Sequence, residues 1–292
     1  SPITWATRNP VDIGAVFSAA AGSEKVPGRM IYVSRPERAL VHNDRSPLLE
    51  VFGRMRAARP DLTLGVCRYY SMYEGSPGVA EVCARADALV ARAEGVEWLG
   101  ELSKRRLYEE MAKAQLVLYP GNADFAETGC IAATEAQACG TPMIGTRIGA
   151  LPETLHQGAG RLIRGDNETE EYQTAFAKAA FSLLDDGEAY RTAQDVGRGW
   201  AQRYDAACVA EDWEQYVYGY FDERFEARKP AVYRQLLWYE DLRAARLLRP
   251  QLPADVADEI DAAATPVCVE ETPAAYAAHA MDPREETVEN GR

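Results

Sequence analysis

Short apolar runs alternate with amphipathic stretches from Met30 to about Glu168, which predicts alternating strands and helices. Strand-like runs occur at 30–34, 62–66, 96–99, 116–119, 143–144 and 161–163. Helical spacing occurs at 47–58, 79–93 and 104–113, with Ser103 as the expected cap of the last, and again after residue 130. Strands joined through helices are connected by right-handed crossovers, so the expected fold is α/β, a single Rossmann-like domain with a parallel β-sheet.

The pattern changes beyond this alternating region. It becomes purely helical after Glu168, with helices expected at 170–185 and 188–204. The chain therefore divides into a lead-in or linker remnant at 1–28, a Rossmann-like domain at 29–205, aromatic-rich C-terminal helices at 206–250 and an acidic, largely flexible tail at 251–292.

The net charge of −13 is distributed unevenly along the 292 residues. Residues 251–292 hold ten acidic residues and two arginines, which is −8, so the first 250 residues carry only −5. Acidity argues against direct binding of nucleic acid or anionic membranes. No apolar run reaches transmembrane length and no signal-peptide pattern opens the sequence, so a cytoplasmic protein is expected.

The cysteines and histidines do not form a metal-binding pattern. Six cysteines are scattered without a close pair, and they are interpreted as reduced core residues. With only three histidines in the chain, no zinc site is expected. We therefore expect no metal and no cofactor.

The segment 124–142 holds the candidate chemistry. Glu127 and Glu135 are separated by seven residues, followed by Gly140 and Pro142, which should end a helix. If both glutamates lay on one helix, eight residues would separate them by about 12 Å along the axis and by roughly 80° around it. Two carboxylates at that distance cannot share one proton or one metal ion. Carboxylates at this spacing can accept hydrogen bonds from hydroxyl groups at the two ends of one ligand. The N-terminus of a helix that begins between them can bind a phosphate group. A nucleotide sugar has these groups; a polar loop followed by a helix with a surface glutamate explains the spacing at least as well.

Five segments in order resemble a known family. They are 31–38, 59–64, 96–100, 125–142 and 149–153. Together they resemble the C-terminal, donor-binding domain of a GT-B fold retaining glycosyltransferase with a Glu-x7-Glu motif, of the glycosyl transferases group 1 type. The resemblance covers about residues 30–165. This sequence has Glu-Thr-Gly-Cys where many relatives have Glu-Gly-Phe-Gly, and Arg38-Ala39 where they have Lys-Gly.

The resemblance implies roles for the residues of the motif. Glu127 would accept hydroxyls of the donor sugar and Glu135 would hold the ribose hydroxyls. The amides of Gly129, Cys130 and Ile131 would bind the diphosphate of a donor such as a UDP- or GDP-sugar.

The resemblance also implies roles for residues in the loops that precede the motif. Arg35 and Arg38 would stabilise the leaving diphosphate, and fixed cations can do so without a metal. Arg35, Arg38 and Glu127 are therefore the candidate catalytic residues. The main chain around Leu99 and Leu102 would bind the base.

The same resemblance raises the question of the acceptor. Residues 9–13 resemble the connection that ends the first domain in this family, so we expect an N-terminal acceptor domain, a separate acceptor subunit, or a homodimer through 206–250. The acceptor itself is unknown. The function predicted is a glycosyltransferase module. A non-catalytic nucleotide-sugar-binding or regulatory subunit and a sugar-nucleotide epimerase on the same fold are the alternatives.

Overall fold

The computed structural model describes residues 8–70, 78–122, 124 and 127–214. These residues belong to a compact unit, Ser1–Val217, and are described by themselves; the second unit is Tyr218–Arg292. The predictions for most of the helices at 206–250, for a dimer through them and for the acidic tail lie outside the described residues.

A six-stranded parallel sheet forms the centre of this unit. Its strands are β1 (Arg29–Tyr32), β2 (Thr63–Cys67), β3 (Val96–Gly100), β4 (Leu116–Tyr119), β5 (Met143–Thr146) and β6 (Gly160–Ile163). The order in space is β3-β2-β1-β4-β5-β6, so the chain winds outward from β1 in one direction and from β4 in the other. This confirms the predicted α/β class with a parallel sheet.

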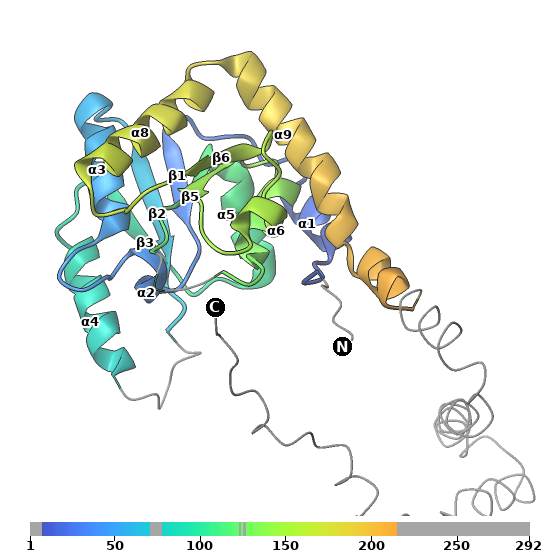
Figure 1. The fold of residues 1–292 in the computed structure, drawn as a ribbon, viewed down its shortest axis with the longest axis horizontal. Coiled ribbons are helices and arrows are strands. Elements are labelled where there is room, and N and C mark those ends of the chain that lie inside the picture. The colour runs from blue at the N-terminus through green and yellow to red at the C-terminus, as the bar shows by residue number, and fades with distance from the viewer. Residues whose placement is uncertain (1–7, 71–77, 123, 125–126, 215–292) are drawn as a thin grey trace, which may run out of the picture. The chain divides into compact units, whose positions relative to one another are not determined.

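Helices cover both faces of the sheet, as Figure 1 shows. On one side α3 packs against α8, and on the other α1 packs against α5 and α6, while α6 contacts α9. The helices are α1 (Ile13–Ala20), α2 (Pro36–Ala39), α3 (Pro47–Ala58), α4 (Val79–Val90), α5 (Lys104–Lys113), α6 (Ile131–Ala138), α7 (Leu151–Thr154), α8 (Glu170–Leu184) and α9 (Gly187–Ala201), which a 3-10 turn, Gln202–Tyr204, extends.

Burial along the strands follows from this layering. All residues of β4 and β5 are buried, whereas the edge strands β3 and β6 are mostly half-buried. Central parallel strands are enclosed on both faces, which explains why they read as continuous apolar runs in the sequence.

Most predicted elements agree with the structure within a few residues. The helix at 47–58 has the predicted bounds, and Ser103 caps α5 by accepting the Arg106 amide at 3.4 Å. The segment 1–28 differs from the expected lead-in, because α1 lies within it and buries Ile13 and Val16. This helix has only eight residues and many small ones, too few apolar positions to establish a helical period.

The cysteine interpretation is partly wrong. Cys67, Cys130 and Cys139 are buried, and burial raises the pKa of each thiol to about 12. Cys208, however, is exposed, in the helical segment that begins at residue 206. All five cysteines of the described residues are free thiols.

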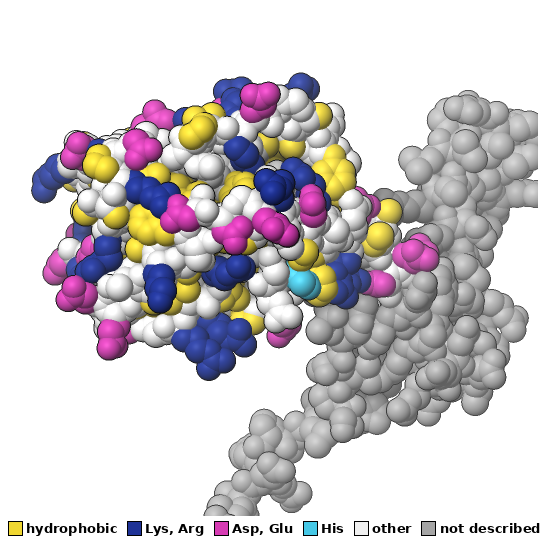
Figure 2. Space-filling model, turned by 90° about the horizontal axis from the view of Figure 1, so that it is seen from above, with side chains coloured by type: hydrophobic (Ala, Val, Ile, Leu, Met, Phe, Trp, Pro, Cys, Tyr) yellow, Lys and Arg dark blue, Asp and Glu magenta, His cyan; other side chains and the backbone are white. Residues whose placement is uncertain are grey.

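Charged side chains are mixed on the surface. Figure 2 shows basic and acidic groups interspersed over one face of the described residues, without a continuous field of either sign on that face. Among the described helices, none is both long and apolar enough to cross a membrane.

Candidate functional site

A cavity of about 450 Å³ opens at the carboxyl ends of the central strands. It is lined by residues that follow β1, β2, β3 and β4, including Ser34, Tyr69, Leu102 and Gly129. The sheet order reverses between β1 and β4, and ligands of open α/β sheets bind at such a switch point. The topology therefore places this cavity where a ligand is expected.

Eight of the nine predicted site residues line this cavity. They are Arg35, Arg38, Leu102, Glu127, Gly129, Cys130, Ile131 and Glu135. The ninth, Leu99, is not among its lining residues. Its side chain lies over β2, where a Cβ placed on Gly65 would be 2.8 Å from Leu99 Cδ1. The side chain of Leu99 thus contributes to sheet packing.

The loop after β1 is fixed by two buried polar side chains. The Tyr32 hydroxyl donates to the Arg35 carbonyl at 2.6 Å. Asn122, which is 3% exposed, donates through its amide nitrogen to the Glu37 carbonyl at 3.1 Å. The Asn122 backbone amide donates to the Arg38 carbonyl, also at 3.1 Å. These bonds tie the arginine-bearing loop to the end of β4.

Glu127 is held from both its side chain and its backbone. The Tyr119 hydroxyl donates to Glu127 Oε1 at 2.5 Å, and Arg38 Nη1 lies 3.5 Å from the same oxygen. The Glu127 carbonyl accepts the Ala150 amide at 2.6 Å. The tertiary structure therefore brings together Arg38 and Glu127, which sequence reasoning assigned to one site.

The start of α6 forms the wall between the two glutamates. Gly129, Cys130 and Ile131 all line the cavity, with Cys130 at the N-cap position. The first backbone N–H groups of a helix have no intrahelical partner and carry partial positive charge. Asn9 steadies this turn by donating to the Gly129 carbonyl at 2.9 Å. The geometry suits an anionic group.

Glu135 lies one turn further along α6 and is only 3% exposed. Its Oε1 accepts from Lys104 Nζ at 2.5 Å and from the Tyr108 hydroxyl at 3.1 Å. A surface glutamate, the alternative explanation for the motif spacing, is therefore ruled out at this position.

Sequence reasoning missed four polar residues near the two glutamates. Lys104 and Tyr69 line the cavity, and Tyr108 and Tyr119 bond to its carboxylates. The sequence pattern predicts only a buried strand at Tyr119 and a helix at Tyr108. A useful signal would have been a tyrosine at the carboxyl end of a strand otherwise made of aliphatic residues.

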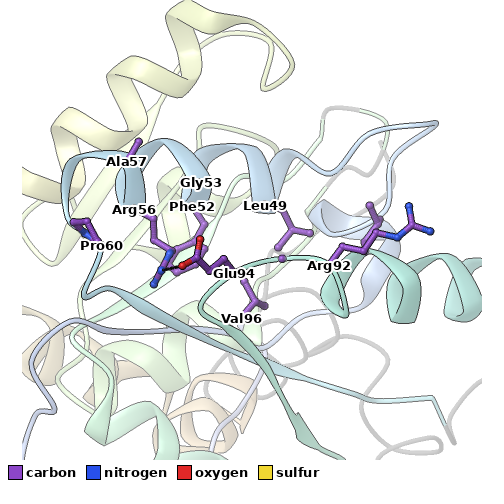
Figure 3. A pocket seen from close by; sticks show the side chains of 11 residues that line it. Leu49, Phe52, Gly53, Arg56, Ala57, Pro60, Arg92, Glu94 and Val96 are labelled. Carbon is purple, nitrogen blue, oxygen red and sulfur yellow. Dashed lines mark hydrogen bonds and ion pairs between the residues drawn. The ribbon is translucent and has the colours of Figure 1, made fainter.

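A second, larger hollow of about 580 Å³ lies elsewhere, between α3 and the entry to β3 (Figure 3). Its lining includes Leu49, Phe52 and Val96, with one ion pair between Arg56 and Glu94 at 3.0 Å. Val96 opens β3, so this hollow lies at the amino end of that strand. It lacks the convergent polar groups of the first cavity and is not the candidate site.

Metal ligands do not cluster in the part of the chain that the structure describes. No group of three or more His, Cys, Asp or Glu side chains there could hold an ion. The expectation that no metal is required stays a prediction.

Comparison with known proteins identifies the family. A family model described as glycosyl transferases group 1 matches residues 37–200, more than half of the chain. The chain belongs to this family. The match includes the cavity residues of the candidate site from Arg38 onward.

Two proteins with assigned names are similar to part of this chain. Alpha-maltose-1-phosphate synthase of Mycolicibacterium smegmatis is 31% identical over 48% of this chain and 35% of its own length. D-inositol 3-phosphate glycosyltransferase of Rhodococcus jostii is 31% identical over 44% of this chain and 28% of its own length. The chain thus matches about a third of the length of these curated relatives.

A solved structure supports the fold. Sucrose-phosphate synthase from Thermosynechococcus elongatus aligns with a TM-score of 0.51 at 23% identity. The alignment covers 74% of this chain and 50% of the other. At this identity the likeness concerns the fold alone, and the α/β architecture is that of GT-B glycosyltransferases.

Proposed function

We propose that this chain binds a nucleoside diphosphate sugar in the cavity and acts in transfer of a hexosyl group with retention of configuration. The observation that carries the proposal is the arrangement of Glu127 and Glu135 on either side of the α6 start, with Arg38 beside Glu127. In this proposal Glu135 accepts the ribose hydroxyls, the α6 amides bind the diphosphate and Glu127 accepts hydroxyls of the sugar. Family membership favours transfer over the epimerase alternative.

The proposed chemistry depends on charge that develops at the diphosphate. The bond between the anomeric carbon and the diphosphate oxygen breaks, and its electron pair leaves with the diphosphate. An acceptor hydroxyl forms the new bond at the same face and gives its proton to the departing phosphate oxygen. Arg35, Arg38 and the α6 N-terminus would stabilise the leaving group, as fixed cations and dipoles do without rearranging.

The acceptor belongs to a further part of the proposal. An N-terminal acceptor domain, a separate subunit or a second copy of the chain would supply the acceptor opposite the cavity. A non-catalytic, nucleotide-sugar-binding chain is distinguished from the enzyme by turnover: slow release of free sugar from the donor, by transfer to water, indicates catalysis.

The first test is ligand-dependent thermal stability with UDP, GDP, ADP and their glucose derivatives. A ligand at a hundredfold excess over its Kd stabilises the folded state by about 2.7 kcal/mol. Glu135→Ala should weaken every binding nucleotide by about 10- to 100-fold, because a hydrogen bond to a charged group contributes about 1.5–3 kcal/mol. Glu127→Ala should weaken only the glucose derivatives.

Glu94→Ala is the matched control, because Glu94 is 89% exposed and pairs with Arg56 outside the cavity. It should leave all affinities unchanged. If none of these six ligands stabilises the wild-type chain, the proposed donor site is wrong.

A further inference from the structure

The carboxylate of Glu127 has two partners at one oxygen. Its Oε1 accepts from the Tyr119 hydroxyl at 2.5 Å and lies 3.5 Å from Arg38 Nη1. The Glu127 side chain is 10% exposed. We call Glu127, Tyr119 and Arg38 the first carboxylate set.

The carboxylate of Glu135 has the same kinds of partner. Its Oε1 accepts from the Tyr108 hydroxyl at 3.1 Å and from Lys104 Nζ at 2.5 Å. The side chain of Glu135 is 4% exposed. Glu135, Tyr108 and Lys104 are the second carboxylate set. The two glutamates that line this cavity thus each have one tyrosine and one cation. The partners of Glu127 come from β4 and α2, and both partners of Glu135 come from α5.

Both sets leave the second oxygen for another partner. A carboxylate offers about four acceptor positions, and among the described residues Oε2 of neither glutamate takes part in a hydrogen bond. Vicinal hydroxyls of a sugar or ribose could bond there. A cation beside each carboxylate also offsets its repulsion of an anionic ligand, which is strong where water is excluded.

Packing holds both tyrosines in place. The ring of Tyr119 stacks on Tyr32, with centroids 6.4 Å apart. Tyr108 is 6% exposed, and Lys104 Nζ lies 5.8 Å from its ring centroid. Burial raises the pKa of both tyrosine hydroxyls, so each is a protonated donor at neutral pH. Rigid donors of this kind restrict the carboxylates to one orientation.

We propose that Tyr119 in the first set, and Lys104 and Tyr108 in the second, are positioning residues that orient and neutralise the two carboxylates for ligand hydroxyls. This inference rests on the proposed function. The inference extends the proposed function by giving each set its own effect on affinity. The second set controls affinity for the nucleotide part of the ligand, and the first set controls the additional affinity due to the sugar.

The test compares two dissociation constants for each variant by calorimetry. One ligand is the nucleoside diphosphate that binds wild type most tightly among UDP, GDP and ADP, and the other is its glucose derivative. Tyr108→Phe and Lys104→Met should weaken both ligands about three- to tenfold and leave the ratio of the two constants unchanged. Lys104→Arg, which keeps the charge, should recover most of the loss.

The first set should behave differently. Tyr119→Phe should leave affinity for the nucleoside diphosphate unchanged and weaken the glucose derivative about three- to tenfold, so the ratio changes by that factor. A purely structural role for the hydroxyl would not change this ratio selectively.

Matched controls remove comparable groups away from the cavity. Tyr190→Phe removes a hydroxyl that bonds to the Gln115 carbonyl at 2.7 Å, and Lys113→Met removes an ammonium 3.0 Å from Glu110. Both should bind like wild type.

The outcomes separate the two claims. If wild type binds no nucleotide, the proposed function fails and this inference fails with it. If wild type binds both ligands but the variants resemble the controls, or all variants change both constants equally, the positioning roles are wrong while the proposed function stands.

Discussion

At Gly149 the chain passes close to the backbone of Glu127. The φ of Gly149 is +46°, and a Cβ there would lie 2.2 Å from the Glu127 carbonyl oxygen. Only glycine meets both conditions, because it adopts a positive φ without strain and has no Cβ to collide with Glu127. The turn that follows supplies the Ala150 amide to the same carbonyl. Position 149 thus sets the place of the Glu127 backbone.

Gly149→Ala should lower the free energy of unfolding by about 1–3 kcal/mol and weaken the glucose derivative more than the nucleotide, because the Glu127 backbone must shift. Urea denaturation and calorimetry measure the two effects. Gly53→Ala is the control: Gly53 lies in α3 with nothing within 4 Å of an added Cβ, so alanine there should be neutral or stabilise by up to about 1 kcal/mol. Equal behaviour of the two variants would refute the steric argument.

Lys25 connects elements at the amino ends of the strands. Its ammonium nitrogen lies 2.8 Å from the Ala114 carbonyl, at the end of α5, and 2.6 Å from Thr141 Oγ1, before β5. Burial is the main cause that lowers the pKa of Lys25 to about 7, and the charge of Arg198 acts in the same direction. Two elements are therefore joined through a group that titrates near neutrality.

The consequence is a pH dependence of stability. Above pH 7 the folded state releases a proton that the unfolded state keeps up to its ordinary lysine pKa, so the contribution of Lys25 to stability rises with pH. Relative to Lys25→Met, wild type should gain about 1–2 kcal/mol of unfolding free energy between pH 7 and 8.5, measured by urea denaturation. Lys178→Met, at an exposed position, should show no such change. A constant difference for Lys25→Met would contradict the lowered pKa.

At the scale of the whole described unit, the two ends of the chain segment meet. Val11 pairs with Asp205 in a parallel bridge, and the Val11 amide donates to the Tyr204 carbonyl at 2.8 Å. Asp205 also accepts the Ile13 amide, at the start of α1, at 3.3 Å. Contacts across more than 190 residues therefore join the start of α1 to the end of α9.

Asp205→Ala should lower the free energy of unfolding by about 1 kcal/mol and the Tm by roughly 2–4 °C, because two backbone amides lose their acceptor. Scanning calorimetry measures this. Asp195→Ala removes an aspartate that is 80% exposed and only pairs with Arg198 at 3.6 Å, so its Tm should stay within 1 °C or so of wild type. An equal loss of Tm in both variants would show that the contact between Asp205 and the start of α1 does not stabilise the fold.

Local patterns in the sequence determined much of this protein. The central strands β4 and β5 are buried apolar runs because helices cover both faces of the sheet, and the bounds of α3 and the Ser103 cap follow from local spacing. Eight of the nine residues that the family resemblance assigned to one site line one cavity, since they lie in the loops and helices that follow parallel strands.

Only the tertiary structure decided which side chains meet. The sheet order places β1 beside β4, which brings Arg38 to Glu127 across almost ninety residues. Tyr108, Tyr119 and Lys104 gave no periodic signal, because their partners lie on other elements. Hydrophobic periodicity reports which face of an element is buried, whereas the convergence of polar groups depends on how the crossovers order the strands.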